Sequence, residues 1–285
     1  MLRAARPSPH SALWCAAELS AVTKAAIPAT TGNVLSLAHA AGMQSSFPLL
    51  QKNYKFSKVL FFGRIMGKAQ DYLVAIGIED SWLGQKKFFF CQDGVSWAQL
   101  PTPTAEEKAN CAKLPSNQLL TGDPSFQIAV PSEPAADEEE EPEKVMIDEV
   151  LRLAVIVETI DSEAAMAPIG ALSMGPTGAV LGNPAFTGID KTTAMSASGY
   201  VFIHKTKPKD ALASAAKKSL DFLVSCDELV PKGALCCGFD DASSVVTVRN
   251  LVWPGFLAYT MPGVAYWGYC YFGTGEKNAD IAFML

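Results

Sequence analysis

The stretch Tyr266-Trp267-Gly268-Tyr269-Cys270-Tyr271-Phe272 carries five aromatic side chains and lies near the end of a 285-residue chain. Successive side chains of a strand point to opposite faces. One face would therefore carry residues 266, 268, 270 and 272, and the other residues 267, 269 and 271, so that both faces hold bulky groups. The pattern fits either a central strand covered on both sides or a strand at an interface with another protein, where Tyr and Trp dominate binding energy.

The segments around this stretch predict further strands. Val245–Leu251 and Phe256–Thr260 precede Ala265–Phe272, and all three are apolar or alternating segments separated by Pro-Gly turns. Such segments predict an antiparallel meander. The chain finishes on Phe283-Met284-Leu285. Chain ends are usually polar and frayed, so we expect this one to be buried, either in the protein's own core or in another protein.

Helices are predicted at the start of the chain. Residues 11–25 and 33–52 are rich in Ala, Leu and Ser. The second segment has apolar positions at helical spacing. The segment Thr30-Thr31-Gly32-Asn33 offers this second helix an N-cap.

Three strands are predicted to follow these helices. Lys58–Met66 and Asp71–Ile78 are β-prone runs joined through residues 67–70, which predicts a hairpin. Lys86–Cys91 predicts a third strand, followed by the turn residues Gln92-Asp93-Gly94.

The middle of the chain contains a short helix, a charged segment and a longer amphipathic segment. We predict the short helix over Ala105–Ala112. Residues 131–142 (PSEPAADEEEEP) are too charged to bury and predict a flexible linker. Lys144–Ile160 has an apolar stripe at helical spacing that favours a helix, while its β-branched residues leave a strand open.

The next segments predict a loop, a strand and a helix. Residues 168–181 are rich in Gly and Pro and should be extended or looped. Tyr200–Lys205 predicts a strand. Asp210–Cys226 predicts a helix whose inward positions would be Leu212, Ala216, Leu220 and Leu223.

Together these elements predict an α+β fold, in which N-terminal helices accompany a predominantly antiparallel β-sheet and an acidic linker joins two halves. We expect a variable, disordered leader over residues 1–28 and helices plus antiparallel strands over residues 29–130. The linker would span residues 131–144. A helix and an antiparallel meander would occupy residues 145–285.

Composition limits the classes of function. Charged residues make up 18% of the chain, against about 25% in a typical domain. Either the core is generous or partners cover part of the surface. The net charge of −6 argues against nucleic-acid binding, and no apolar run approaches the length of a membrane span. The seven cysteines, at positions 15, 91, 111, 226, 236, 237 and 270, are irregularly spaced and indicate reduced thiols.

Candidate chemical motifs each have a simpler structural interpretation. Gly273-Thr274-Gly275-Glu276-Lys277 lacks the spacing of a phosphate-binding loop and favours a turn that ends a strand. Cys236-Cys237 near Asp240-Asp241 lacks a second ligand pair at zinc-finger spacing and favours a strand. None of the histidines, His10, His39 and His204, has a recognisable nucleophile motif nearby. We therefore predict no catalytic, cofactor-binding or metal-binding residue, and no cofactor.

Two charged segments could contact partners. Lys205, Lys207 and Lys209 form a small basic patch around Pro208, which is either a contact for an acidic partner or a solvated loop. Asp137–Glu141 is either an electrostatic surface or part of a solvating linker.

Five motifs, which occur in family order, resemble the radial spoke head protein 9 family. They span the chain from Leu49 to Leu285 and are Val59–Gly67 with Asp71-Tyr72, Gly122–Phe126, Leu220–Leu223 with Val230–Gly233, Leu251–Gly255, and Gly273–Asn278 through Phe283-Met284-Leu285. The resemblance implies a non-enzymatic structural subunit of the radial spoke head in motile cilia and flagella. Such a subunit supports spoke head assembly and mechanical signalling between the central pair and the dynein arms.

The resemblance also implies partners and a location. The partners would be other spoke head proteins, namely the four/six-type paralogues and the MORN-repeat subunits, together with the spoke stalk scaffold and, transiently, the central pair apparatus. The location would be the cytoplasm and the axoneme. Neither nucleic acid nor membrane is expected as a partner.

One alternative arises from the first residues. Arg3 and Arg6 lie among Ala and Ser, with no acidic residue before Glu18, a composition that also occurs in organelle transit peptides. An organelle-targeted enzyme, or a cytosolic enzyme or adaptor without a recognisable active-site motif, is therefore the alternative function.

Overall fold

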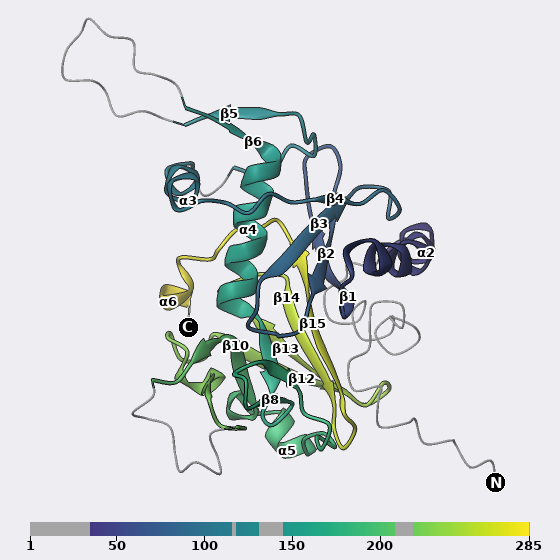
Figure 1. The fold of residues 1–285 in the computed structure, drawn as a ribbon. Coiled ribbons are helices and arrows are strands. Elements are labelled where there is room, and N and C mark those ends of the chain that lie inside the picture. Colours follow the sequence, from purple (N-terminus) through teal and green to yellow (C-terminus); the bar gives the residue numbers. More distant parts are fainter. Residues whose placement is uncertain (1–34, 116–117, 131–144, 209–218, 285) are drawn as a thin grey trace, which may run out of the picture.

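A computed structural model describes residues 35–115, 118–130, 145–208 and 219–284 of the chain. Its main element is an eight-stranded sheet (Figure 1). The order across the sheet is β12 (Leu235–Asp240), β13 (Val245–Asn250), β14 (Phe256–Met261), β15 (Tyr266–Gly273), β1 (Lys58–Ile65), β2 (Tyr72–Ile78), β3 (Lys86–Cys91) and β4 (Ala98–Gln99). All neighbouring strands but one pair are antiparallel. The predicted α+β class is confirmed.

The predicted hairpin and meander are both present in this sheet. β1 and β2 pair antiparallel, and β3 continues the order. β13, β14 and β15 pair antiparallel in sequence order, as the Pro-Gly turns between them indicate. Every residue of β2 is buried, which explains why its sequence is continuously apolar rather than alternating.

The aromatic stretch is a central strand. β15 lies between β14 and β1, and its side chains alternate between the two faces of the sheet as predicted. Trp267 and Tyr271 belong to the core on one face, and Cys270 and Phe272 belong to the core on the other. Of the two interpretations left open by the sequence, the covered central strand is the one that the structure contains.

β1 and β15 form the one parallel pair of the eight-stranded sheet, which the sequence did not predict. Gly63, Arg64 and Ile65 lie opposite Tyr271, Phe272 and Gly273. The pairing joins strands from residues 29–130 and from residues 145–285 in one sheet. Gly63 has φ +155°, and a Cβ there would lie 2.0 Å from the Tyr271 carbonyl oxygen, so only glycine permits this close approach of the two backbones.

Helices cover the two faces of the sheet (Figure 1). Helix α2 (Leu37–Tyr54) buries Met43, Phe47 and Leu50 against one face. Helix α4 (Glu149–Ala164) buries Leu153, Val157 and Ile160 against the other. The predicted helix over 33–52 is thus confirmed, but its N-cap is Ser36, whose hydroxyl accepts a hydrogen bond from the His39 amide. The N-cap that we expected within residues 30–33 is wrong because the helix begins later.

Both interpretations of residues 144–160 are partly right. Met146–Asp148 forms β6, which pairs with β5 (Gln127–Ala129). α4 then begins at Glu149 and continues to Ala164. The short helix α3 (Ala105–Ala112) has the predicted bounds.

The bounds of α3 follow from a capping box. The Glu107 amide donates to the Thr104 hydroxyl at 3.3 Å, and the Glu107 carboxylate accepts from the Thr104 amide at 2.7 Å. These reciprocal bonds satisfy two of the amides that a helix start leaves free. Since α3 buries none of its side chains, the cap contributes a large share of its local stability.

We expect Thr104→Ala to destabilise α3 by about 1 kcal/mol, because the hydroxyl acceptor at the N-cap is lost. Hydrogen exchange of the amides of residues 105–112 should accelerate by roughly fivefold, while exchange in β2 stays unchanged. Thr102→Ala, at an exposed position two residues earlier, is the matched control. Equal exchange in both variants would contradict the capping role.

Smaller sheets complete the fold beside α4. β7 (Met166–Pro168), β10 (Tyr200–Thr206) and β11 (Leu223–Ser225) form a three-stranded sheet, and β8 (Leu172–Met174) pairs with β9 (Val180–Gly182). The strand expected at Tyr200–Lys205 and the extended segment at 168–181 are confirmed. Short helices occur at α5 (Lys191–Ala194), η2 (Ala197–Gly199), η4 (Cys226–Glu228) and α6 (Ile281–Met284).

The helix predicted over Asp210–Cys226 is wrong at its described end. Leu223–Ser225 forms β11, and Leu220, expected to face inward, is exposed. Leu223 is buried, as expected, and the adjacent Phe222 is buried as well. Two adjacent buried residues satisfy a short strand but not the helical spacing that suggested the prediction. Leu212 and Ala216 lie outside the described residues, as do the predicted helix 11–25, the leader 1–28 and the linker 131–144.

Candidate functional site

A group of four polar side chains joins α4 to both sheets. Asp161 on α4 accepts a hydrogen bond from Lys86 Nζ at 2.6 Å, and the same oxygen, Oδ2, lies 2.9 Å from His204 Nε2. Its other oxygen, Oδ1, accepts from the Tyr269 hydroxyl at 2.9 Å. Lys86 comes from β3, Tyr269 from β15 and His204 from β10. We call this group the Asp161 cluster; it ties the large sheet, the helix and the three-stranded sheet together.

The Asp161 cluster contains a buried ion pair between Lys86 and Asp161. The side chains of Lys86 and Asp161 keep 3% and 4% of their accessible surface. Burial alone would raise the pKa of Asp161, but the charge of Lys86 and the hydrogen bond from His204 lower it below its ordinary value. Burial and the Asp161 charge raise the pKa of Tyr269 far above its usual range. At neutral pH, therefore, Asp161 is ionised and Tyr269 is protonated.

A cleft of about 300 Å³ opens beside this cluster. Lys86, Asp161 and His204 lie in its wall together with Glu158 and Ser162. The Ser162 hydroxyl donates to the Thr159 carbonyl at 3.0 Å, whereas the contacts of the His204 ring are with Lys86 and Asp161. Lys86, Asp161 and His204 are thus engaged with one another, while Glu158 pairs through Oε1 with Lys108, outside the wall. The contacts of these three side chains suit a structural tie better than a nucleophile–base pair.

A second buried carboxylate organises another junction. Glu149, at the start of α4, accepts hydrogen bonds from the Tyr72 hydroxyl at 2.9 Å and the Gly122 amide at 2.7 Å through Oε1. Its other oxygen accepts from the amide and the hydroxyl of Thr121. Burial, together with the hydrogen bond and charge of Glu149, raises the pKa of Tyr72 well above its usual value. Glu149 therefore fixes the segment around Gly122 to the sheet.

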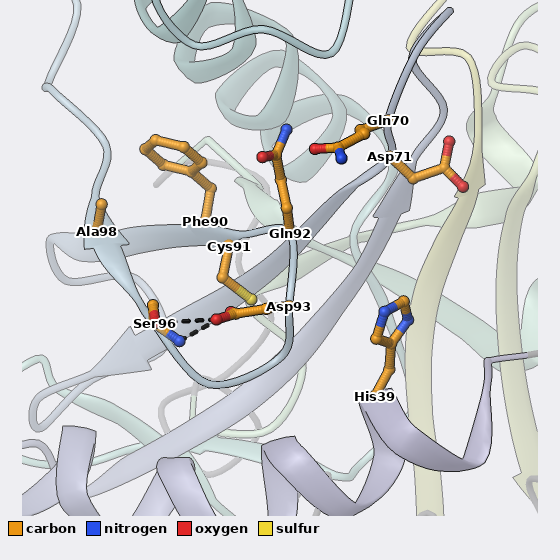
Figure 2. A pocket seen from close by; sticks show the side chains of 9 residues that line it. All are labelled: His39, Gln70, Asp71, Phe90, Cys91, Gln92, Asp93, Ser96 and Ala98. Carbon is orange, nitrogen blue, oxygen red and sulfur yellow. Dashed lines mark hydrogen bonds between the residues drawn. The ribbon is translucent and has the colours of Figure 1, made fainter.

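A hollow of about 600 Å³ lies between α2 and the turn that connects β3 to β4 (Figure 2). Asp93 shapes this turn by accepting from the amides of Ser96 and Val95, both at 2.9 Å, and these bonds lower the pKa of Asp93. Burial raises the pKa of the Cys91 thiol to about 12, so it is protonated at neutral pH and a poor nucleophile. His39 and Asp71 lie at the edge of the hollow in Figure 2, apart from Asp93 and Cys91.

The motifs considered as candidate chemical sites lie in a strand or in the segment that follows one. Gly273-Thr274-Gly275-Glu276-Lys277 follows the end of β15, as the turn interpretation expected, and Lys277 pairs with Glu163 at 2.7 Å. Cys236-Cys237 lies in β12, as expected for a strand. All six cysteines that the structure describes are free thiols. Within the described part of the chain, no group of three or more His, Cys, Asp or Glu side chains could hold a metal ion.

Two lysines of the predicted basic patch make contacts with other residues of the same chain. Lys205 Nζ lies 4.2 Å from the centre of the Phe202 ring, and Lys207 donates to Asp221 at 2.6 Å. Lys209, the acidic run Asp137–Glu141, His10 and Cys15 lie outside the described residues. No described helix is both long and apolar enough to cross a membrane.

The C-terminal helix α6 exposes large apolar side chains. Ile281 is buried, but Phe283 and Met284 keep 89% and 69% of their accessible surface. Of the two ways of burying this end that the sequence suggested, the core formed by the described residues does not cover these two side chains. They remain available to another protein.

Comparison with known proteins finds several relatives that share one name. No protein-family model matches the chain. The radial spoke head protein 9 homolog of Danio rerio is 35% identical over 267 residues, which cover 91% of this chain and 96% of the relative. Those of Mus musculus and Homo sapiens are 34% and 33% identical over 263 residues, covering 90% of this chain and 95% of each relative.

Proposed function

Since the chain belongs to the radial spoke head protein 9 family, we propose that it is a non-enzymatic structural subunit through which the spoke head assembles and passes on mechanical signals. Membership of this family means that the chain is a radial spoke head protein, located in the axoneme of cilia or flagella. The observation that carries the assignment is similarity along nine-tenths of the chain, with almost the whole length of each relative covered.

The contacts inside the two hollows support a role without catalysis. In the cleft, the carboxylate, ammonium and imidazole groups of the Asp161 cluster bond to one another. In the hollow of Figure 2, the Asp93 carboxylate accepts hydrogen bonds from amides of its own turn, and the Cys91 thiol is protonated. Groups committed in this way would have to rearrange before they could activate a substrate.

A rigid body suits a subunit that transmits force. The sheet is covered by helices on both faces, and the Asp161 cluster connects four elements that lie far apart in the sequence. We propose that signals between the central pair and the dynein arms pass through this rigid body rather than through a hinge within it.

The proposed partners are other radial spoke proteins: the four/six-type paralogues, the MORN-repeat subunits and the stalk scaffold, with transient contact to the central pair apparatus. The exposed Phe283 and Met284 offer one contact for such a protein. Large exposed apolar side chains commonly mark contact sites between proteins.

Fractionation of detergent-extracted cilia tests the assignment. We expect the protein to stay in the salt-resistant axoneme and to be released only as a large complex with other spoke head proteins. Recovery as a free monomer, or enrichment in an organelle fraction, would contradict the assignment and favour the alternative of an organelle-targeted or cytosolic enzyme or adaptor.

The exposed end of the chain gives a sharper prediction. Replacing Phe283 and Met284 by serine should weaken incorporation into the spoke head by at least about tenfold, since large apolar contacts are lost from an interface. Thermal unfolding of the isolated chain should be unchanged, because both side chains are exposed. Competition of tagged wild-type and variant chains for incorporation measures the effect. Replacing the exposed Val230 by serine is the control, and equal incorporation of the two variants would refute the prediction.

A further inference from the structure

The two ends of the eight-stranded sheet differ in how they are protected. β4 has only two residues, and Pro101 and Pro103 follow it closely. β12 has six residues and contains no Pro, Lys or Arg. Among the described strands, β12 pairs only with β13. Proteins usually protect an edge strand by shortness, proline or lysine, so β4 is protected and β12 is not.

The backbone of β12 presents a regular row of free groups. The Leu251 amide donates to the Ala234 carbonyl, and alternate residues of an antiparallel strand bond to the same neighbour. Residues 236, 238 and 240 therefore bond to β13, while the N–H and C=O groups of Leu235, Cys237 and Phe239 point away from it. No other described residue supplies a partner to these outward groups.

The side chains at the same three positions are also incompletely covered. Leu235, Cys237 and Phe239 are half-buried and pack at the border of the core on the α4 face. Lys191 Nζ lies 3.4 Å from the centre of the Phe239 ring and holds this ring in place. β12 thus offers both backbone groups that lack hydrogen-bond partners among the described residues and apolar side chains that are only partly covered.

We propose that β12 pairs antiparallel with β12 of a second copy of this chain, about a two-fold axis at Cys237. In this register Leu235 faces Phe239 of the second copy, and Cys237 faces its equivalent. All outward N–H and C=O groups of both strands then have partners. The apolar borders of the two cores meet on one face, because opposite residues of paired strands share a face.

Charge complementarity favours a second copy in this register. Lys232 lies in the turn before β12, and Asp241 lies directly after the strand; both are exposed. Antiparallel pairing about Cys237 sets residue 232 of one copy opposite residue 242 of the other. Lys232 therefore comes next to Asp241 of the second copy at both ends of the paired strands. Parallel pairing would instead align like charges.

The oligomeric state of the full-length chain tests this arrangement by sedimentation equilibrium. The wild-type chain should form a dimer at micromolar concentration. Lys232→Glu or Asp241→Lys alone should raise the dimer dissociation constant by roughly tenfold, and the two changes together should restore it, because the charges are exchanged across the interface. A monomeric wild-type chain, or a dimer indifferent to all three variants, would overturn the proposal while leaving membership of the spoke head untouched.

A proline and a chemical cross-link test the register itself. Cys237→Pro removes only an amide that points away from β13, so the chain should fold and no longer dimerise. A short bismaleimide should join Cys236 of one copy to Cys236 of the other, since diagonal neighbours on paired strands lie about 7–8 Å apart. Since Cys237 of the two copies would also lie within reach of this reagent, the product should disappear only when Cys236→Ser and Cys237→Ser are combined, and Cys111→Ser should not affect it. A cross-linked product that survives the combined change would place the interface elsewhere. If the proline variant does not fold, the charge exchange decides between the two outcomes.

Discussion

Asp161→Ala should lower the free energy of unfolding by about 3–5 kcal/mol, since removing one partner of a buried ion pair leaves the other charge uncompensated. Lys86 would remain almost fully buried without its carboxylate, and the Tyr269 hydroxyl would lose its acceptor. Urea unfolding at pH 7, followed by circular dichroism, measures the loss. Glu79→Ala is the control, because the Lys87–Glu79 pair is exposed and should contribute below about 1 kcal/mol.

A second substitution separates the ion pair from the packing. Lys86→Met combined with Asp161→Ala removes both charges, so it should destabilise the protein less than the sum of the two single changes. Additive losses would show that Lys86 and Asp161 are not coupled. The effect would then have to come from the cavity left at residue 161 and from the lost hydrogen bond of Tyr269.

The contribution of Asp161 should also depend on pH. Its pKa is lower in the folded protein than the value of about 3.9 in an unfolded chain. The stabilisation is therefore complete above the unfolded pKa and is lost as the pH falls through the folded pKa. The difference in stability between the wild-type chain and Asp161→Ala should be largest at neutral pH and shrink in acid. A constant difference would contradict a carboxylate role.

Trp253→Ala should cost about 3–5 kcal/mol, the usual range for deleting a buried tryptophan side chain. Trp253 keeps only 4% of its accessible surface. Its indole Nε1 donates to Glu163 at 3.0 Å, and Lys277 Nζ lies 5.8 Å from its ring centre. The side chain thereby fixes the segment after β15 to the end of α4.

Two comparisons isolate the origin of that effect. Trp253→Phe keeps most of the apolar volume and loses the hydrogen bond, so it should cost clearly less than the alanine variant. Phe283→Ala removes an aromatic side chain that is largely exposed and should change stability by less than about 0.5 kcal/mol. An unchanged melting temperature for Trp253→Ala would show that the site is not packed as described.

Local sequence signals predicted the elements that local interactions determine. The hairpin of β1 and β2 follows from two apolar runs around a short connection, and α3 has the bounds that its capping residues dictate. The end of the predicted helix over 210–226 is wrong because Leu223–Ser225 pairs with β10 in a sheet, and this tertiary contact overrides the apolar spacing.

Features that depend on distant residues could not be predicted in this way. Lys86 and His204 lie 75 and 43 residues from Asp161, and no spacing in the sequence connects them. Glu149 is fully buried among four hydrogen-bond donors, although nothing in the sequence around it distinguishes it from an exposed acidic residue. The pairing of β1 with β15 is hidden for the same reason, since each strand carries only its own apolar pattern.

That pairing has a consequence for synthesis in the cell. β1 and β15 are separated by some two hundred residues and still lie side by side. A ribosome therefore releases β1 and β2 long before the strand that completes the sheet exists, and the edge of β1 waits unpaired on the nascent chain. A premature stop codon ahead of Tyr266 would leave this edge open permanently. Such a product should aggregate or be degraded rather than persist as a smaller functional protein.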